Sequence, residues 1–324
     1  MDNSKGEKHS IITLKKNDMK KNPLVSVPVI TYNSSETIVD TLDSIKHQTY
    51  QNIELIISDD CSTDNTVAIC QYWIEQNKER FVQTQLLTVN KNTGVSANVN
   101  RAWKACKGEW VKGVAGDDVL INTCIQNIVN FFTDNPSCIC AFAQMSAFGR
   151  EPEENMEYIQ RVFNYEFFQW SYEKQKEFMI YERNCLPAPT FFFNRKVILE
   201  DLNIYADERI PMIDDVALWI NLLLNGVHFG FLNKKIVLYR LSDTSVSTTH
   251  TPSLRTKQSI ALIYLLYRFK PRFKSGKYNK LGEIRKYIYA ANTAYGGKFW
   301  KLIICVDKSL AIILNKLGID IKVL

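Results

Sequence analysis

Three pairs of adjacent aspartates are the residues of this chain whose type and spacing could do chemistry. The pairs are Asp59-Asp60, Asp117-Asp118 and Asp214-Asp215. Neighbouring carboxylates suit a hard divalent ion such as Mg²⁺ or Mn²⁺, which commonly takes one or two carboxylates together with the phosphates of a bound nucleotide. A Gly-Asp-Asp triplet such as 116–118 also suits an ordinary exposed turn. The elements that precede the pairs must therefore decide between a metal site and a turn.

The first two pairs follow predicted strands. Residues 53–58 are almost continuously apolar and end at Asp59, and the mostly apolar stretch 109–116 ends at Asp117. Parallel strands place their carboxyl ends at one sheet edge, where open α/β sheets bind ligands, so one ligand could reach both pairs. Tyr32 follows the predicted strand 24–30 and offers that edge an aromatic face for a nucleobase, the alternative being a half-buried structural ring.

Strands and amphipathic helices alternate over residues 24–145, which predicts a doubly wound, mainly parallel sheet flanked by helices. The predicted strands are 24–30, 53–58, 85–89, 109–116 and 138–145. The inward helix faces between them are Ile38, Leu42 and Ile45, then Val67, Cys70 and Ile74, then Ile125, Ile128, Val129 and Phe132. Asn33 with Glu36 three residues later has the form of a helix start.

The pattern changes after Met145. Residues 150–155 form an acidic connector containing proline, and the aromatic-rich stretch 158–181 shows no clean periodicity. Further strands are predicted at 191–194, 227–232 and 236–241. A helix opening at 211–215 turns Leu218 and Leu222 inward, and Asn225-Gly226 should end it.

Composition is that of an ordinary globular protein, with 324 residues, 46% of them hydrophobic and 23% charged. Eight cysteines without a Cys-x-x-Cys pair favour a reduced, cytoplasmic setting over disulfides or structural zinc. Neither a signal peptide nor a membrane-spanning run is predicted. No Gly-x-Gly-x-x-Gly or Gly-x-x-x-x-Gly-Lys-Ser/Thr motif occurs, so phosphate charge must be met by a metal or by Lys and Arg.

Motifs spread over residues 24–247 resemble those of family 2 glycosyltransferases of the GT-A fold. In chain order they are Val25-Ser26-Val27, Thr31-Tyr32-Asn33, Leu42-Asp43-Ser44-Ile45, Gln48-Thr49-Tyr50, Asp59-Asp60-Cys61-Ser62-Thr63-Asp64, Gly116-Asp117-Asp118, Asp214-Asp215, Trp219 and Tyr239-Arg240. The resemblance implies an inverting, metal-dependent enzyme that moves one sugar from a nucleotide-sugar, with uracil the favoured base, to an acceptor hydroxyl. The expected acceptor is a saccharide or lipid-linked saccharide in cell-surface polysaccharide or glycolipid assembly.

The resemblance also assigns roles and regions. Tyr32 and Asp60 would hold the base, and Asp117 would lie near the ribose and the Mn²⁺ or Mg²⁺ ion. Asp118 would be the main metal ligand, Arg240 would bind the donor, and Asp215 would be the general base. Residues 1–22 would be a flexible polar leader, 23–145 the nucleotide-sugar-binding half, 146–254 the acceptor-binding half, and 255–324 a basic, amphipathic helical extension.

Some residues depart from the family pattern. Ile30 replaces the usual Pro before Thr-Tyr-Asn, with Pro28 two residues earlier, and Cys61 replaces the usual Gly after the first Asp pair. Ser242 stands where members often carry a His, which puts an additional metal or phosphate ligand in doubt, and Asp214 replaces the commoner Glu. The Gln-x-x-Arg-Trp signature of processive members is absent, consistent with one sugar per encounter.

Two other functions compete with this interpretation. A nucleotidyltransferase shares the sheet type and the metal chemistry, but its Gly-rich loop after the first strand has no counterpart in 31–36. A non-catalytic sugar-binding or lipid-binding module would keep the fold without turnover, which the intact Asp117, Asp118 and Asp215 argue against.

The charge distribution points to an anionic partner for the end of the chain. Residues 255–324 carry fifteen Lys and Arg but only three Asp and Glu. Residues 1–254 carry 25 Lys and Arg and 31 Asp and Glu, so a basic segment follows an acidic one. Apolar residues at spacings of three and four follow the basic stretch, namely Ile303, Val306, Leu310, Ile313 and Leu317. We expect peripheral docking on the anionic inner face of the plasma membrane rather than nucleic-acid binding. Packing of the stripe on the catalytic domain or on a second subunit is the alternative.

Overall fold

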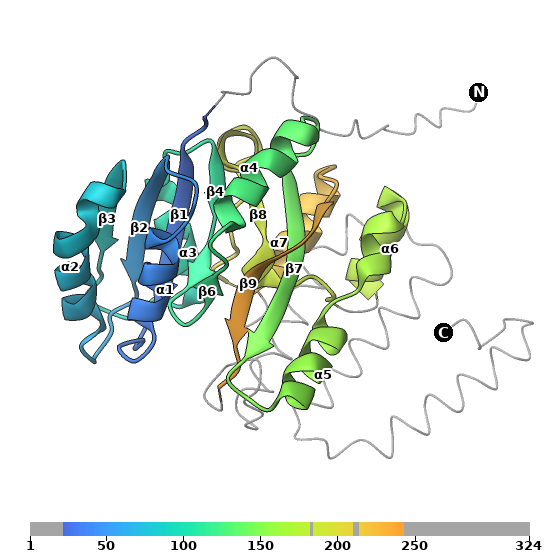
Figure 1. The fold of residues 1–324 in the computed structure, drawn as a ribbon. Helices are drawn as coiled ribbons and strands as arrows, with labels where there is room; N and C mark the ends of the chain where they lie inside the picture. Colours follow the sequence, from blue (N-terminus) through green and yellow to red (C-terminus); the bar gives the residue numbers. More distant parts are fainter. Residues whose placement is uncertain (1–21, 182–183, 210–213, 243–324) are drawn as a thin grey trace, which may run out of the picture. The chain divides into compact units, whose positions relative to one another are not determined.

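The computed structural model describes residues 22–181, 184–209 and 214–242. The predicted basic extension 255–324 and nearly all of the leader 1–22 lie outside these residues. A mixed α/β arrangement fills the described part, with helices on both faces of a curled sheet (Figure 1). Across the described ranges no helix is long and apolar enough to cross a membrane.

The first half of the sheet is parallel, as the alternation of strands and helices predicts. Its strands are β1 (Val25–Thr31), β2 (Ile53–Asp59), β3 (Gln83–Leu87), β4 (Trp110–Lys112) and β5 (Val114–Ala115). β1 pairs in parallel with β2, β4 and β5, and β2 with β3. Strands β1 and β2 are buried along almost their whole length, which explains their continuous apolar runs.

Helices α1 (Ile38–Lys46), α2 (Thr66–Asn77), α3 (Val95–Ala105) and α4 (Cys124–Asp134) connect these strands and lead into the second half. Figure 1 shows α1 in front of the sheet and α3 behind it. The predicted inward faces of α1 and α4 are buried. In α2 only Cys70 of the predicted face is buried, and Thr66 and Trp73 take the other inward positions.

The predicted helix start at Asn33 is wrong. Asn33 has a φ of 52° and lies before α1, which begins at Ile38. Its side-chain oxygen accepts a hydrogen bond from the backbone N–H of Thr63, 2.8 Å away in the loop after β2. A contact between two loops therefore uses the group that a local helix cap would need.

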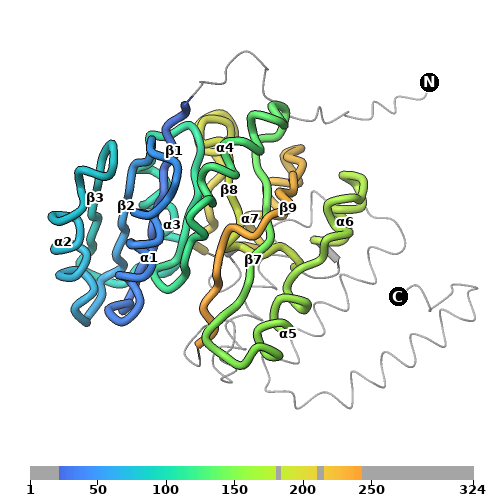
Figure 2. The backbone as a smooth tube through the Cα atoms, in the orientation of Figure 1, coloured from blue at the N-terminus to red at the C-terminus, as the bar shows by residue number. Residues whose placement is uncertain are grey.

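The second half of the sheet mixes directions. Its strands are β6 (Val119–Leu120), β7 (Cys140–Phe148), β8 (Phe192–Asn194) and β9 (Gly230–Arg240). β8 runs antiparallel to both β4 and β7, β9 runs parallel to β7, and β6 runs antiparallel to β9. The strand order over the described residues is β3-β2-β1-β4-β8-β7-β9-β6, with β5 beside β1. Figure 2 shows β9, the last described strand, running beside β7.

Two predictions for this half are wrong. The strands predicted at 227–232 and 236–241 form the single strand β9, whose pairing with β7 shifts register near Gln144. The connector predicted at 150–155 is largely the first turn of α5 (Pro152–Val162), because proline suits the first position of a helix.

The remaining elements pack around the second half. They are α6 (Tyr172–Tyr181), α7 (Asp214–Leu224), the 3-10 turns η2 (Lys78–Arg80), η3 (Tyr165–Gln169) and η4 (Ala188–Thr190), and the π-helical segment η5 (Lys196–Asp201). Helix α7 ends as predicted, with Gly226 at a φ of 80° just beyond it, while residues 211–213 of the predicted opening lie outside the described residues. Trp219 of α7 fixes the helix, because its ring meets those of Phe142 and Phe191 with centroids 4.9 and 4.4 Å away.

Strand directions place one set of strand ends at a common edge. Strand β8 runs antiparallel to both β4 and β7, so β7 points the same way as β4 and its parallel neighbours β1 and β2. Strand β9 is parallel to β7 and therefore points the same way. The carboxyl ends of all five strands therefore meet at one edge of the sheet. Tyr32, Asp60, the aspartates after β5, and Arg240 all follow or end these strands.

Candidate active site

A tight turn carries the central acid pair. After β5 the chain turns through Gly116, Asp117 and Asp118, and the backbone N–H of Gly116 donates to Ile30 O at 2.9 Å. A Cβ on Gly116 would lie 2.9 Å from Thr31 Oγ1, so only glycine allows the turn to approach the end of β1 this closely. The acid pair is thus held against the strand that leads to Tyr32.

Asp118 is a buried carboxylate with one unsatisfied oxygen. Its residue is 1% exposed, and its Oδ1 accepts a hydrogen bond from the backbone N–H of Arg240 at 3.0 Å. Its Oδ2 is buried and finds no hydrogen-bond donor anywhere in the described chain. Burial, and next the charge of Asp117, raises the pKa of Asp118 to about 8, although Arg240 and Lys112 oppose the shift.

Asp117 is partly buried beside Asp118, and burial also raises the pKa of its carboxyl. Two adjacent acids with raised pKa values and one orphaned oxygen are costly to leave as they are, because a buried acceptor without a donor loses its hydration. A cation at this position would remove both costs.

Arg240 brings the end of β9 to the acid turn. Its Nε donates to the backbone oxygen of Asp117 and its Nη2 to Asp40 Oδ2, both at 2.8 Å. The guanidinium lies over the ring of Phe148, with its carbon 4.6 Å from the ring centroid. Pairing of β9 with β6 sets this position, because β6 directly follows Asp118. Arg240 therefore lies beside the acid pair.

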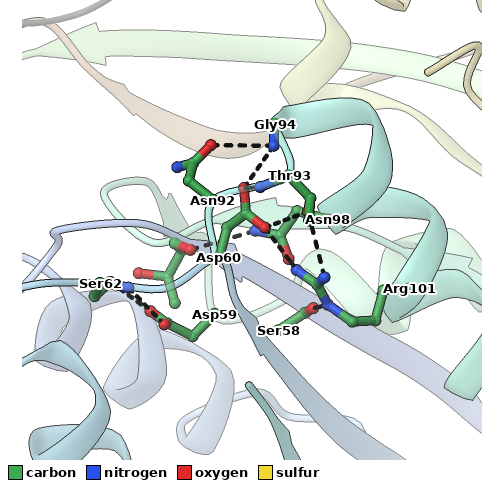
Figure 3. A network of polar contacts seen from close by, with 10 residues as sticks. Ser58, Asp59, Asp60, Ser62, Asn92, Thr93, Gly94, Asn98 and Arg101 are labelled. Carbon is green, nitrogen blue, oxygen red and sulfur yellow. Dashed lines mark hydrogen bonds and ion pairs between the residues drawn. The ribbon is translucent and has the colours of Figure 1, made fainter. Parts of the chain in front are cut away.

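Asp60 is satisfied by the protein itself. It is 2% exposed, and its Oδ2 accepts from the backbone N–H groups of Thr93 at 2.9 Å and Gly94 at 2.7 Å (Figure 3). Its Oδ1 accepts from Thr93 Oγ1 at 2.5 Å and from Arg101 Nη2 at 2.9 Å. Burial by itself raises the pKa of Asp60, but these hydrogen bonds outweigh it and hold the pKa below its ordinary value.

Arg101 is a site residue that the sequence reasoning missed. From α3 it also donates to Ser58 Oγ at 2.9 Å and to Asn98 Oδ1 at 2.8 Å, and so joins β2, α3 and the loop before α3 (Figure 3). A single arginine in an amphipathic helix gives no periodic signal. Only its place three residues after Asn98, on the same helix face, could have indicated a polar pair.

The loops after β1 and β2 are hydrogen-bonded to each other. Besides the Asn33 contact, Ser34 N donates to Thr66 Oγ1 at 2.8 Å and Ser35 N to Asp64 Oδ2 at 3.1 Å. Tyr32, at the start of the first loop, is 48% exposed, so its ring is open to solvent at the expected edge.

Asp215 is held by contacts with other parts of the chain than the acid turn. Its Oδ2 accepts from Asn184 Nδ2 at 2.9 Å and its Oδ1 from the backbone N–H of Val216 at 2.7 Å. The structure thus brings Tyr32, Asp60, the acid turn and Arg240 to one sheet edge, and it anchors Asp215 through the segment that precedes β8.

The donor set at the acid turn is that of a partial metal site. Within the described residues, no three His, Cys, Asp or Glu side chains gather around a common point. Two adjacent carboxylates with one unpartnered oxygen are instead a usual protein ligand set for Mg²⁺ or Mn²⁺, because these ions complete their coordination with phosphates and water. The residues present therefore fit such an ion.

A family model described as glycosyl transferase family 2 matches residues 26–202. The chain belongs to this family. It is therefore a glycosyltransferase, and the enzyme class expected from its motifs is confirmed.

Two relatives match most of the chain. The chain is 28% identical over 250 residues to the Escherichia coli UDP-Glc:alpha-D-GlcNAc-diphosphoundecaprenol beta-1,3-glucosyltransferase WfaP, covering 73% of this chain and 85% of that protein. It is 26% identical over 231 residues to the putative teichuronic acid biosynthesis glycosyltransferase TuaG of Bacillus subtilis, covering 70% of this chain and 82% of that protein.

Solved structures share the fold. The 1–349 portion of S. aureus TarS in complex with UDP-GlcNAc matches with a TM-score of 0.57 at 18% identity, over 84% of this chain and 81% of that one. The mannosyltransferase PcManGT from Pyrobaculum calidifontis, in complex with GDP-Man and Mn²⁺, matches with a TM-score of 0.57 at 17% identity, over 93% and 83%. The predicted GT-A fold is confirmed for the described residues.

Proposed function

We propose that this glycosyltransferase moves one sugar from a UDP-sugar to an acceptor hydroxyl with inversion, using Mn²⁺ or Mg²⁺, in the assembly of a cell-surface polysaccharide or glycolipid. The observation that carries the proposal is the buried Oδ2 of Asp118, which has no protein donor within the described residues. The names of WfaP and TuaG, and the UDP-GlcNAc complex of TarS, support the donor and the product class.

The donor would lie along the carboxyl edge of the sheet. The exposed ring of Tyr32 would stack on the base, while Asp60 and Arg101 would hold the loop 92–94 that borders it. Asp118, with Asp117, would hold the divalent ion, which when bound neutralises negative charge that develops on the diphosphate as it leaves. Arg240 adds a fixed positive charge beside the same turn.

Asp215 would accept the proton of the acceptor hydroxyl. The acceptor oxygen forms a bond to the anomeric carbon as the bond from that carbon to the diphosphate oxygen breaks, and that bonding pair leaves with the diphosphate. Attack from the opposite side inverts the anomeric carbon. A positioned base contributes about 10²- to 10⁴-fold to such a step.

The acceptor side of the proposal rests on charge and on one relative. The name of WfaP specifies a sugar carried on diphosphoundecaprenol, which favours a lipid-linked acceptor here. The fifteen Lys and Arg of residues 255–324 would then dock the enzyme on an anionic leaflet.

Calorimetric titration with UDP in the presence and absence of Mn²⁺ tests the metal site. We expect Mn²⁺ to raise the affinity of the unchanged chain for UDP, and Asp118→Asn to abolish that increase. Asp59→Asn is the matched control, because Asp59 belongs to an acid pair at the same edge of the sheet. Its Oδ1 already accepts a hydrogen bond from the backbone N–H of Ser62 at 2.9 Å. The proposal would be refuted if Mn²⁺ did not change the affinity of the unchanged chain for UDP, or if Mn²⁺ raised the affinity of Asp118→Asn as much as that of the unchanged chain.

A further inference from the structure

Hydrogen bonds to both carboxylate oxygens orient Asp215, and two of them come from Val216 and Asn184. The bond to Oδ1 comes from the N–H of Val216, the next residue in the same helix. The bond to Oδ2 comes from the Asn184 side chain, 31 residues earlier. Asn184 therefore ties the carboxylate of Asp215 to a distant part of the chain.

Asn184 is itself held in place. Its Oδ1 accepts from the backbone N–H of Leu186 at 3.0 Å, so both ends of its amide are engaged. This arrangement also fixes which end of the amide faces the carboxylate: the Nδ2 donor points to Asp215 because the oxygen is used locally. The amide links the acid to the segment 184–190 that leads into β8.

The segment 184–190 is bound to the sheet by a buried lysine. Lys112 of β4 is 0% exposed, and its Nζ donates to Pro189 O at 2.7 Å and to Gly113 O at 2.5 Å. Burial lowers the pKa of Lys112. A buried ammonium is expensive, and here it joins the chain just before the acid turn to the segment that carries Asn184.

Strand pairing puts this segment at the donor edge of the sheet. Because β8 runs antiparallel to β4, with Phe192 opposite Lys112, residues before Phe192 extend beyond the carboxyl end of β4. The acid turn leaves the same end. Thr190 adds a second anchor, since its Oγ1 accepts from the N–H of Ala143 at 3.2 Å.

We infer that Asn184 is a positioning residue for Asp215, and that the segment 184–190, fastened by Lys112, sets Asp215 relative to the acid turn. This inference rests on the proposed function, in which Asp215 is the base. Asn184 contacts neither donor nor acceptor in this scheme. It restricts the carboxylate to one orientation, so that an oxygen faces the acceptor instead of rotating away.

The test uses the full chain in the presence of Mn²⁺. A panel of UDP-sugars, including UDP-glucose and UDP-N-acetylglucosamine, is first screened for one that the unchanged chain hydrolyses. The release of UDP from that donor is then measured for each variant. Water is the acceptor, so no acceptor need be identified. We expect Asn184→Ala to lower kcat about 10- to 100-fold with an unchanged KM for the UDP-sugar, since misplacing a reacting group by about 1 Å can cost 10²-fold. Asn225→Ala is the control, because it removes a 2.8 Å side-chain bond at the far end of the same helix.

An exchange of the two side chains separates positioning from folding. Asn184→Asp keeps an acceptor for Leu186 but places two carboxylates together, which should lower both Tm and kcat. Adding Asp215→Asn rebuilds the pair in reverse, with the new amide at 215 donating to the carboxylate at 184. We expect the exchanged pair to recover Tm and to remain inactive.

The outcomes distinguish failure of the inference from failure of the proposed function. Full kcat in Asn184→Ala, with Asp215→Asn inactive, would overturn the positioning role and leave the base in place. An equal loss of kcat and of donor affinity in Asn184→Ala would show a merely structural role and would also overturn it. An active Asp215→Asn, or no turnover of any UDP-sugar by the unchanged chain, would count against the proposed function itself.

Discussion

Replacing Cys61 by glycine should stabilise this protein. Cys61 follows Asp60 directly and has a φ of 68°, in the left-handed region that side chains with a Cβ avoid. An L-residue there costs about 1–2 kcal/mol, whereas glycine adopts the conformation freely. Glycine in turn costs about 0.5–1 kcal/mol because the unfolded chain gains freedom. The difference predicts a net gain of about 0.5–1 kcal/mol for Cys61→Gly.

Cys61→Ala is the variant that isolates the backbone effect. It removes the sulfur but keeps the Cβ, so the strain remains and stability should stay within about 0.5 kcal/mol of the unchanged chain. Donor affinity should not change in either variant, because the partners of Asp60 come from residues 93, 94 and 101. Urea unfolding followed by circular dichroism measures the three midpoints.

The comparison between the two variants can refute the reasoning. If Cys61→Gly unfolds at a lower urea concentration than Cys61→Ala, the left-handed backbone at Cys61 is not a source of strain. The same result would remove the physical explanation for the glycine that family members usually carry at this position.

Three other predictions concern charged residues of the chain. Arg101→Ala should lower the free energy of unfolding by about 2–3 kcal/mol in urea titrations, because the buried Asp60 keeps its hydrogen bonds from Thr93 and Gly94 but loses the positive charge of Arg101. Arg101→Lys should recover only part of this loss, and a loss below about 0.5 kcal/mol in Arg101→Ala would contradict the prediction. Burial raises the pKa of Asp64, but hydrogen bonds, first of all from Thr66, lower it to about 2. The ionised carboxylate of Asp64 therefore contributes its full stabilisation above the unfolded pKa of about 4, and this stabilisation is lost as the pH falls through about 2. Asp64→Asn should flatten the pH dependence of Tm in that window, and an unchanged slope would show that Asp64 is not the titrating group. Deleting 255–324 should abolish sedimentation with vesicles rich in anionic lipid; binding that persists, or that ignores salt and lipid charge, would exclude membrane docking by this region.

The sequence was sufficient for the parts of the fold that depend on local pattern. Apolar runs and helical periodicity predicted β1, β2, α4 and the buried face of α1 nearly as observed, and the end of an apolar run located the acid turn. The break predicted within β9 came from the polar residues 233–235, which are exposed while the strand continues through them. Pairing with β7 holds the strand together there through a register shift, and local polarity carries no information about that.

Contacts between distant segments could not be predicted in this way. The bond from Arg240 N–H to Asp118 spans 122 residues, and its existence depends on the order of strands in the second half of the sheet. The buried Lys112 gave no signal either, because a single lysine in an apolar run suggests an exposed position. Tertiary partners, here Pro189 and Gly113, decide whether such a charge can be buried.

The two aspartate pairs at the sheet edge show why motif and structure must be combined. In sequence, Asp60 and Asp118 are each the second acid after a strand, and both are almost fully buried. Four hydrogen bonds satisfy Asp60 and lower its pKa, whereas Asp118 has one such bond from Arg240, a raised pKa and an oxygen without a donor among the described residues. The described protein groups therefore satisfy the carboxylate of Asp60 but only one oxygen of Asp118, so Asp118 is the acid whose pKa should respond to a bound cation.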